Sequence, residues 1–253
     1  MQATERISFI KNKLYSEKKV TIAYIAKKLN VSYPTVRKDF NLIANSDKNI
    51  KKIHGGLCLE SKENDTLDLY AKRLIKNEKQ KREIASKALS FIPEKSTILL
   101  DSSSTTFELA RAMCKLDYKF TVITNGISTA RLLSTNNKIT VIILPGIIHK
   151  DSNTVIDEFN FNFSDRFNVD IFIFSATGLT LEGGFSEYNL QEVSHKNHNI
   201  KLSKKAIALI DSSKFGKASS ANFAKLEDID ILITDNDLDT NTKSKYATKV
   251  NII

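Results

Sequence analysis

The feature that most constrains the fold is a pair of short helical patterns joined by a tight turn, within residues 20–57. Thr21 and Ser32 stand where side-chain caps of the two helices are expected, and Asn30 suits a left-handed C-cap. Apolar residues recur with the spacing of amphipathic helices at Ile22, Ile25, Ala26, Leu29, Val36, Phe40 and Ile43, and upstream at Ile7, Ile10 and Leu14. The pattern predicts a helix-turn-helix supported by a preceding helix.

The net charge of the chain is concentrated in the same region. Residues 1–57 hold twelve Lys and Arg against four Asp and Glu, a net of +8, whereas the whole chain has a net charge of +9. A local excess of this kind is the electrostatic mark of a protein that binds the phosphate backbone of nucleic acid. We therefore expect residues 1–57 to be a winged helix-turn-helix domain that binds double-stranded DNA.

The second helix, at about residues 33–43, is the predicted recognition helix. A basic strand follows it and ends at Gly55 and Gly56, which allow a tight turn in the wing. The predicted DNA-binding residues are Tyr33, Thr35, Arg37, Lys38, Lys51, Lys52 and His54. We expect Asp39 to face a Lys or Arg within the domain. A structural salt bridge from Arg37 to Asp39 or Glu5 is the alternative to a DNA contact.

The remaining composition excludes several classes of protein. No apolar run approaches the roughly 18 residues of a membrane span, and the N-terminus lacks the apolar core of a signal peptide, so we expect a cytoplasmic protein. Cys58 and Cys114 have no metal-ligand spacing and are expected to be reduced thiols. His195 and His198 could share a helix face and bind a metal, but no third ligand is evident, and a surface pair is the simpler interpretation. No cofactor or catalytic residue is predicted.

A polar segment over residues 60–68 is expected to be an exposed linker, and a charged helical stretch follows from Tyr70 to Pro93. We expect a connector at 58–78 and a second domain at 79–253. There, apolar runs alternate with helical patterns, which predicts an α/β domain with a mainly parallel sheet. The predicted strands are 97–100, 120–124, 140–144, 171–175, 206–210 and 229–233, and the predicted helices are 107–115, 127–134 and 191–201.

Small, hydroxylated and amide side chains follow these strands. Residues 101–106 read Asp-Ser-Ser-Ser-Thr-Thr, and Thr124-Asn125-Gly126 and residues 211–216 close two other strands. Ligands of open α/β sheets bind at the carboxyl ends of the strands, and a hydroxyl-rich loop before a helix suits a phosphate. Lys214 could supply a matching cation. Individually these Ser and Thr side chains could simply cap helices, and Asp101 could either cap the next helix or accept sugar hydroxyls.

The motifs resemble one family of regulators. Residues 31–40, VSYPTVRKDF, and the segment IKKIHGGL are similar to the DNA-binding domain of DeoR/GlpR-type transcriptional regulators. The segments TILLDSSSTTFELAR, TVITNGISTARLL, GGFSEYNLQEVSHK and DSSKFGK resemble the effector domain of that family. The resemblance implies a sensor domain similar in fold to ribose-5-phosphate isomerase and coenzyme A transferases. It also implies a phosphorylated sugar or related metabolite as effector.

Carried over by position, the implied effector-binding residues are Asp101, Ser104, Thr105, Thr106, Asn125 and Lys214, with Glu192 and Lys196 at family positions of less defined role. Ser103 stands where the family usually has glycine. The expected function is a DNA-binding transcriptional regulator, a repressor of a carbohydrate-utilisation operon. The alternatives are an enzyme resembling sugar-phosphate isomerases, with Asp101 or Asp211 as its base, and an architectural DNA-binding protein without an effector. We expect a homo-oligomer, a dimer or tetramer, with coupling through the connector or through the oligomer interface.

Overall fold

The computed structural model describes residues 3–17, 19–47, 50–53, 55–59, 66–148, 153–159 and 162–253. They belong to two compact units, Met1–Asp65 and Thr66–Ile253. The division falls inside the predicted connector 58–78, whose role as a connector stays a prediction. His54 was expected to contact DNA and lies outside the described residues. None of the helices in the described ranges is both long enough and apolar enough to cross a membrane.

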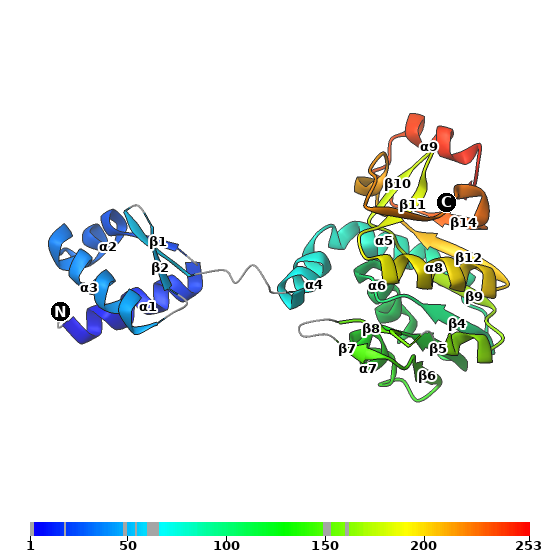
Figure 1. Cartoon of the computed structure of the whole chain (residues 1–253), viewed down its shortest axis with the longest axis horizontal. Helices are drawn as coiled ribbons and strands as arrows, with labels where there is room; N and C mark the ends of the chain where they lie inside the picture. The colour runs from blue at the N-terminus through cyan, green and yellow to red at the C-terminus, as the bar shows by residue number, and fades with distance from the viewer. Residues whose placement is uncertain are drawn as a thin grey trace. The chain divides into compact units, whose positions relative to one another are not determined.

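The first unit is a small helical domain with an antiparallel sheet (Figure 1). The strand order of this sheet is β1-β3-β2. Its helices and strands are α1 (Ala3–Glu17), β1 (Lys19–Thr21), α2 (Ile22–Leu29), α3 (Tyr33–Ser46), β2 (Ile50–Ile53) and β3 (Gly56–Leu59). The helix-turn-helix is therefore α2 and α3, and β2 and β3 form the wing.

Local chemistry explains where the two helices begin and end. The Thr21 hydroxyl accepts a hydrogen bond from the Tyr24 amide at 3.2 Å, and Ser32 accepts one from the Thr35 amide at 3.4 Å. Asn30 closes α2 in the left-handed conformation, with φ 51°. These three caps confirm the boundaries expected from the sequence.

The core of the first unit is built from the predicted apolar stripes, including Ile25, Val36 and Phe40. One charged group is buried beside it: Asp39 is 2 % exposed. Its carboxylate binds the Arg6 guanidinium through two contacts, Nε to Oδ2 at 2.5 Å and Nη2 to Oδ1 at 3.0 Å. The expectation of a partner within the domain is confirmed. The alternative of an Arg37–Asp39 bridge is wrong, because α1 supplies Arg6 instead.

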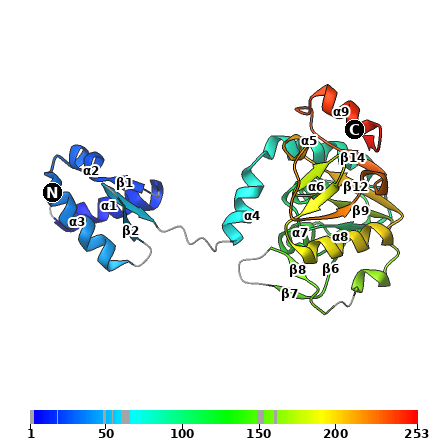
Figure 2. The ribbon, with the colours of Figure 1, turned by 45° about the horizontal axis from the view of Figure 1, so that its top comes forward.

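The second unit contains a seven-stranded parallel sheet in the order β15-β14-β12-β9-β4-β5-β6. Its strands β14, β12 and β9 can be followed side by side in Figure 2. Its strands are β4 (Thr97–Leu100), β5 (Phe120–Thr124), β6 (Ile139–Ile143), β9 (Ile171–Phe174), β12 (Lys205–Leu209), β14 (Ile231–Ile233) and β15 (Asn251–Ile252). The predicted α/β class is confirmed. Each of the six predicted strands is present, with bounds that differ by two residues at most.

The two faces of the sheet carry different layers. One face packs Ile98 and Leu100 against α5 (Glu78–Ala88), α6 (Ser104–Met113) and α7 (Ile127–Leu133). On the other face, Leu99 and Phe172 share a core with α8 (Leu190–Leu202), α9 (Thr240–Ala247) and a small antiparallel sheet. That small sheet has the order β10-β11-β13, with β10 (Gly178–Thr180), β11 (Gly184–Glu187) and β13 (Ala221–Ala224). Alternate residues of each strand thus serve opposite layers, as expected for a sheet covered on both faces.

The helical stretch expected from Tyr70 to Pro93 is divided. It forms α4 (Thr66–Ile75), α5 and the short 3₁₀ helix η1 (Leu89–Phe91). Asn77 lies between α4 and α5 in the left-handed conformation, with φ 54°. The expected helical stretch is therefore present but interrupted at Asn77, and α4 begins at Thr66, inside the segment 60–68 that was expected to be a linker.

Shorter elements complete the second unit. They are the hairpin of β7 (Ile147–Ile148) and β8 (Val155–Ile156) and the 3₁₀ helices η2 (Phe163–Arg166), η3 (Ser212–Lys214) and η4 (Leu226–Asp228). η3 lies in the loop that follows β12, within the predicted residues 211–216. This loop returns to the carboxyl edge of the sheet, where the candidate site is found.

Candidate DNA-binding surface and anion pocket

The outer face of α3 presents the predicted DNA-binding side chains. Tyr33 is 54 % exposed, and Arg37 and Lys38 are also exposed. Arg37 makes no ion pair with a described residue, so its guanidinium is available to a ligand. Thr35 is half-buried, and its hydroxyl lies 2.9 Å from the Ser32 hydroxyl at the N-cap. The helix therefore offers two cations and one aromatic ring to solvent, which are groups that bind base edges and phosphates.

The wing adds further cations beside this helix. Lys51 and Lys52 are exposed on β2, opposite β3. Gly56 lies so close to β1 that an added Cβ would be 2.4 Å from the Val20 carbonyl oxygen. Gly55 adopts φ 76° in the turn itself. The two glycines thus serve different purposes: Gly55 permits the turn, and Gly56 permits the close packing of strands.

In the second unit, the carboxyl ends of β4 and β9 meet at the point where the strand order reverses, the usual ligand position in such sheets. Asp101 follows β4 and is 3 % exposed. Its Oδ2 accepts a hydrogen bond from the Ser175 amide at 2.9 Å, and its Oδ1 accepts one from the Thr106 hydroxyl at 2.7 Å. The carboxylate therefore ties two neighbouring strands together.

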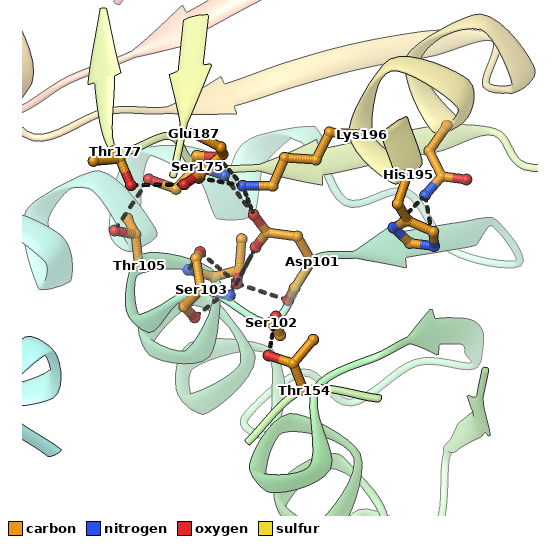
Figure 3. Close-up of polar contacts among 12 residues, drawn as sticks. Asp101, Ser102, Ser103, Thr105, Thr154, Ser175, Thr177, Glu187, His195 and Lys196 are labelled. Carbon is orange, nitrogen blue, oxygen red and sulfur yellow. Dashed lines mark hydrogen bonds and ion pairs between the residues drawn. The ribbon is translucent and has the colours of Figure 1, made fainter. Parts of the chain in front are cut away.

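A buried lysine completes this arrangement. Lys196 extends from α8 toward Asp101 and Glu187 (Figure 3). Its Nζ lies 2.6 Å from Glu187 Oε1, 3.2 Å from Asp101 Oδ2 and 2.7 Å from the Ser175 carbonyl oxygen. Burial acts to lower the pKa of Lys196, but the charges of Glu187 and Asp101 outweigh it and raise the pKa. All three donors of this ammonium are occupied, so Lys196 holds the site together.

The loop before α6 is ordered by its own hydroxyl groups. The Ser103 hydroxyl is the N-cap of α6 and accepts a hydrogen bond from the Thr106 amide at 3.2 Å. The Thr106 hydroxyl is fully buried and donates to Asp101. Ser103 has φ −72°, a backbone conformation that does not require glycine, so serine fits at this position. The N-terminus of α6 therefore presents its positive dipole end at this edge of the sheet.

A cavity of about 120 Å³ lies against this helix terminus, and we call it the cationic pocket. Four basic residues line it: Arg73, Lys76, Lys81 and Lys214. Hydroxyl groups and carboxylates complete the wall with Ser103, Ser104, Thr105, Thr177, Glu187 and Asp211. Glu187 is already bound to Lys196, and Asp211 Oδ1 accepts a hydrogen bond from Asn77 Nδ2 at 3.0 Å. The pocket is therefore suited to a small anion.

Burial lowers the pKa of Lys214 in this pocket, Asp211 and Glu187 oppose that shift, and the nearby charges of Lys76 and Arg73 add to it. Burial likewise lowers the pKa of Lys81. Cations crowded in this way repel one another while the pocket is empty. An anion that enters would relieve the repulsion.

A second cavity of about 360 Å³ opens between β8 and α8. Asn125, Glu192 and His195 line it together with Asp157 and Glu158. Desolvation, with the nearby charges of His198 and Lys196, lowers the pKa of His195 to about 4. Burial raises the pKa of Glu192. His198 binds Asp165 with Nε2 2.5 Å from Oδ1, and no group of three or more metal-ligating side chains occurs among the described residues.

The predicted effector residues thus separate into three groups. Ser104, Thr105 and Lys214 line the cationic pocket, and Asn125 lines the second cavity. Asp101 and Thr106 lie buried beneath the pocket and bind each other. Sequence reasoning did not select Arg73, Lys76 or Lys81. The charged stretch that contains these three residues was the available signal. The break of the helix at Asn77 is what places them around the cationic pocket, and the sequence does not show that break.

Both carboxylates considered as a catalytic base are engaged in the protein. Asp101 binds Lys196 and accepts hydrogen bonds from the Ser103 and Ser175 amides and the Thr106 hydroxyl. Asp211 is 1 % exposed and accepts hydrogen bonds from Asn77 and from the Ser213 amide. Asp211 lines the cationic pocket, but Asn77 and Ser213 already bind its carboxylate, and Lys196 holds Asp101, so both carboxylates order the loops at this edge of the sheet.

Comparison with known proteins gives a consistent result for both units. Residues 6–63 match a DeoR-like helix-turn-helix domain, and residues 76–236 match the DeoR C terminal sensor domain. The HTH-type transcriptional regulator GolR of Listeria innocua is 34 % identical over 242 residues, which cover 96 % of this chain and 94 % of that protein.

More distant relatives have similar coverage. The Glycerol-3-phosphate regulon repressor of Escherichia coli is 26 % identical over 93 % of this chain and 92 % of its own length. The L-fucose operon activator of Haemophilus influenzae is 29 % identical over 93 % of this chain and 92 % of its own length. Among solved structures, ribose 5 phosphate isomerase A of Neisseria gonorrhoeae aligns over 53 % of this chain and 52 % of its own, with 18 % identity and a TM-score of 0.40.

Proposed function

The chain belongs to the DeoR family of DNA-binding transcriptional regulators, and we propose that it represses a carbohydrate-utilisation operon under the control of a phosphorylated sugar or related metabolite. The family consists of regulators rather than enzymes. The observation that carries the proposal is the cationic pocket at the carboxyl edge of the sensor sheet. The names of two relatives, a glycerol-3-phosphate regulon repressor and an L-fucose operon activator, support carbohydrate control.

In this proposal the DNA-bound state uses α3 in the major groove. Arg37 and Lys38 contact guanine edges or phosphates, Thr35 contacts a base or a phosphate, and Tyr33, near the start of the helix, also touches the DNA. Lys51, Lys52 and His54, which belong to the predicted wing, contact the phosphate backbone of the DNA. The exposure of Tyr33, Arg37, Lys38, Lys51 and Lys52 supports the assignment. The protein acts in the cytoplasm, where operator DNA lies, as a homo-oligomer whose heads read two half-sites.

The effector is proposed to place its phosphate in the cationic pocket. Lys214 and the N-terminus of α6 supply opposite charge, and the hydroxyl groups of Ser104 and Thr105 supply hydrogen bonds. Asp101 and Thr106 support this edge from below, and Asn125 lines the adjacent cavity. Because a ligand changes DNA affinity only through different affinity for two states, effector binding must favour the state that releases DNA.

A thermal-shift screen tests the effector class. Phosphorylated sugars and glycerol phosphates are compared with their unphosphorylated parents, and each stabilising compound is then added to an operator-binding assay. We expect a phosphorylated compound to raise the melting temperature and weaken operator binding, whereas its parent does neither. Lys214→Ala should keep operator affinity and lose most of the response.

Two other outcomes would change the proposal. Equal stabilisation by a phosphorylated compound and its parent would remove the phosphate from the effector. A compound that tightens operator binding would make the protein an activator or a co-repressor-dependent repressor. If none of these compounds alters stability or operator affinity, effector-free DNA binding gains support.

A further inference from the structure

The cationic pocket contains residues from the segment that leads toward the DNA-binding unit. Arg73 lies in the last turn of α4, and Lys76 and Asn77 form the corner between α4 and α5. All three line the pocket together with Lys214. A ligand in the pocket can therefore contact both the end of α4 and the loops at the carboxyl edge of the sensor sheet.

The end of α4 is held by a buried ammonium group. Lys81 is 4 % exposed, and its Nζ donates to the carbonyl oxygens of Arg73 and of Lys76, the latter at 2.7 Å. A positive charge at a helix C-terminus is favourable because it opposes the helix dipole. The clamp uses backbone carbonyls, so the side chains of Arg73 and Lys76 remain available to the pocket.

The corner itself is tied to the loop that carries Lys214. Asn77 has φ 54° and ψ 37°, and its Nδ2 donates to Asp211 Oδ1 and to the Ser213 hydroxyl, each at 3.0 Å. Lys81 also donates its amide to the Asn77 carbonyl oxygen at 3.1 Å. The path of α4 is thus set by contacts that converge on the pocket wall.

Among the side chains of α4 that the structure describes, residues 70–75, Tyr70 is the buried one. Tyr70 is 6 % exposed, and its ring lies 5.7 Å from the Arg73 guanidinium. The Tyr70 hydroxyl and the Asn153 amide nitrogen are buried without a well-formed hydrogen bond to a described residue. Burial raises the pKa of Tyr70 to about 12. Polar groups buried in this way weaken the packing of α4.

We propose that an anionic group in the cationic pocket bridges Lys214 of the sensor domain to Arg73 and Lys76 of the α4 corner, so that ligand occupancy fixes the direction of α4. The α4 corner is then the route by which the effector acts on DNA binding. This inference rests on the proposed function in one respect, namely that the effector is an anion. It decides between the two routes left open by the sequence in favour of the connector.

Inorganic phosphate is the probe, titrated into the full-length protein at constant ionic strength with chloride as the matched salt. Hydrogen exchange of the α4 amides and thermal stability are the two measurements. In the wild type, phosphate should slow exchange in α4 and raise the melting temperature. Arg73→Gln and Lys76→Gln should each weaken phosphate binding about fivefold, as expected for a charge-assisted contact partly screened by solvent.

Lys79→Gln is the matched control, because Lys79 is an exposed cation close to the corner that does not line the pocket. It should bind phosphate like the wild type. The melting temperature without phosphate shows that each variant is folded. Wild-type affinity in Arg73→Gln and Lys76→Gln would overturn the inference, and so would phosphate protection confined to residues 211–216.

Failure of this inference and failure of the proposed function give different results. If phosphate protects the pocket loop without slowing exchange in α4, the anion site stands and only the route through α4 falls. If phosphate has no effect on the wild type, both the anion site and the bridge fall. Operator binding, measured separately, still tests the regulator itself.

Discussion

At the scale of single residues, the two units use ionic groups in opposite ways. The buried carboxylate of Asp39 is matched by Arg6, and the buried ammonium of Lys196 is matched by Glu187 and Asp101. Arg37, Lys38 and Lys214 are not matched in this way and lie where a ligand can reach them. Buried pairs fix the fold, and the cations outside such pairs are the proposed ligand contacts.

Arg37 and Lys52 form a contrasting pair of tests. Arg37→Ala should abolish specific operator binding while the second unit stays folded, because a base-edge contact is lost. Lys52→Ala should weaken binding to all sequences and lower the slope of log K against log salt by about one unit, because a phosphate contact is lost. Titration of operator and random duplexes at several salt concentrations measures both effects. Unchanged affinity in Arg37→Ala would contradict the assignment of α3 to the groove.

His195 gives a pH prediction. Its pKa of about 4 in the folded protein lies below the ordinary value of 6.5, so the unfolded chain takes up the proton first as the pH falls. The stabilising contribution is complete above about pH 6.5 and decreases toward pH 4, with a slope of at most about 1.4 kcal/mol per pH unit. Urea unfolding at several pH values measures this slope. His195→Gln should flatten it, and an equal slope in wild type and variant would show that His195 is not its source.

At the scale of elements, the helices and strands that show a regular spacing of apolar residues could be predicted from the sequence, whereas contacts between distant segments could not. Strands such as 97–100 and 120–124 were evident as apolar runs, and the caps at Thr21 and Ser32 followed from residue type. The break at Asn77 was missed because the sequence there has neither glycine nor proline. The small sheet β10-β11-β13 was missed because its strands are short and two of them begin with glycine.

The candidate site was predictable only in part, for the same reason. Ser104, Thr105 and Lys214 follow strand ends, so chain position alone indicates the carboxyl edge. Arg73 reaches that edge only because α4 ends at the left-handed residue Asn77. Lys196 is not available to a ligand there because its ammonium group binds Glu187. Neither event has a local sequence signal, since each depends on groups brought together by the tertiary fold.

The wing provides a prediction about an element. Gly56→Ala places a Cβ 2.4 Å from the Val20 carbonyl oxygen, so β1 and β3 must separate. The first unit should lose about 1–3 kcal/mol of stability, as for other overpacked sites. Gly55→Asn is the control, because nothing lies within 4 Å of an added Cβ there and asparagine tolerates positive φ. Amide exchange of the first unit measures both, and equal effects would contradict the close-packing role of Gly56.

At the scale of the whole molecule, charge and sensing are divided between the two units. Residues 1–57 carry a net charge of +8 of the chain's +9, whereas the sensor unit is close to neutral and gathers four basic side chains around one pocket. The DNA-binding unit therefore supplies general electrostatic attraction to DNA. In the proposed function, the sensor unit controls when the DNA is bound. The proposed homo-oligomer would join the two roles, because two heads held together read a longer site than one.

Half-site spacing tests this assembly. Two heads read half-sites about one helical turn apart, so an insertion of about five base pairs between them rotates one site to the opposite face of the duplex. We expect this insertion to weaken operator binding at least tenfold and an insertion of a full turn to restore part of the affinity. Binding that is indifferent to spacing would indicate that each head acts alone.

The contact of Lys81 with the end of α4 affects which residues can change during the evolution of such a regulator. Lys81 holds backbone carbonyl oxygens, so the clamp is indifferent to which side chains occupy positions 73 and 76. Those two positions can exchange cations for neutral or acidic groups without disconnecting the helix from the sensor domain. The contact between Lys81 and the end of α4 can therefore be kept during evolution while the ligand that the pocket binds changes from one regulator to another.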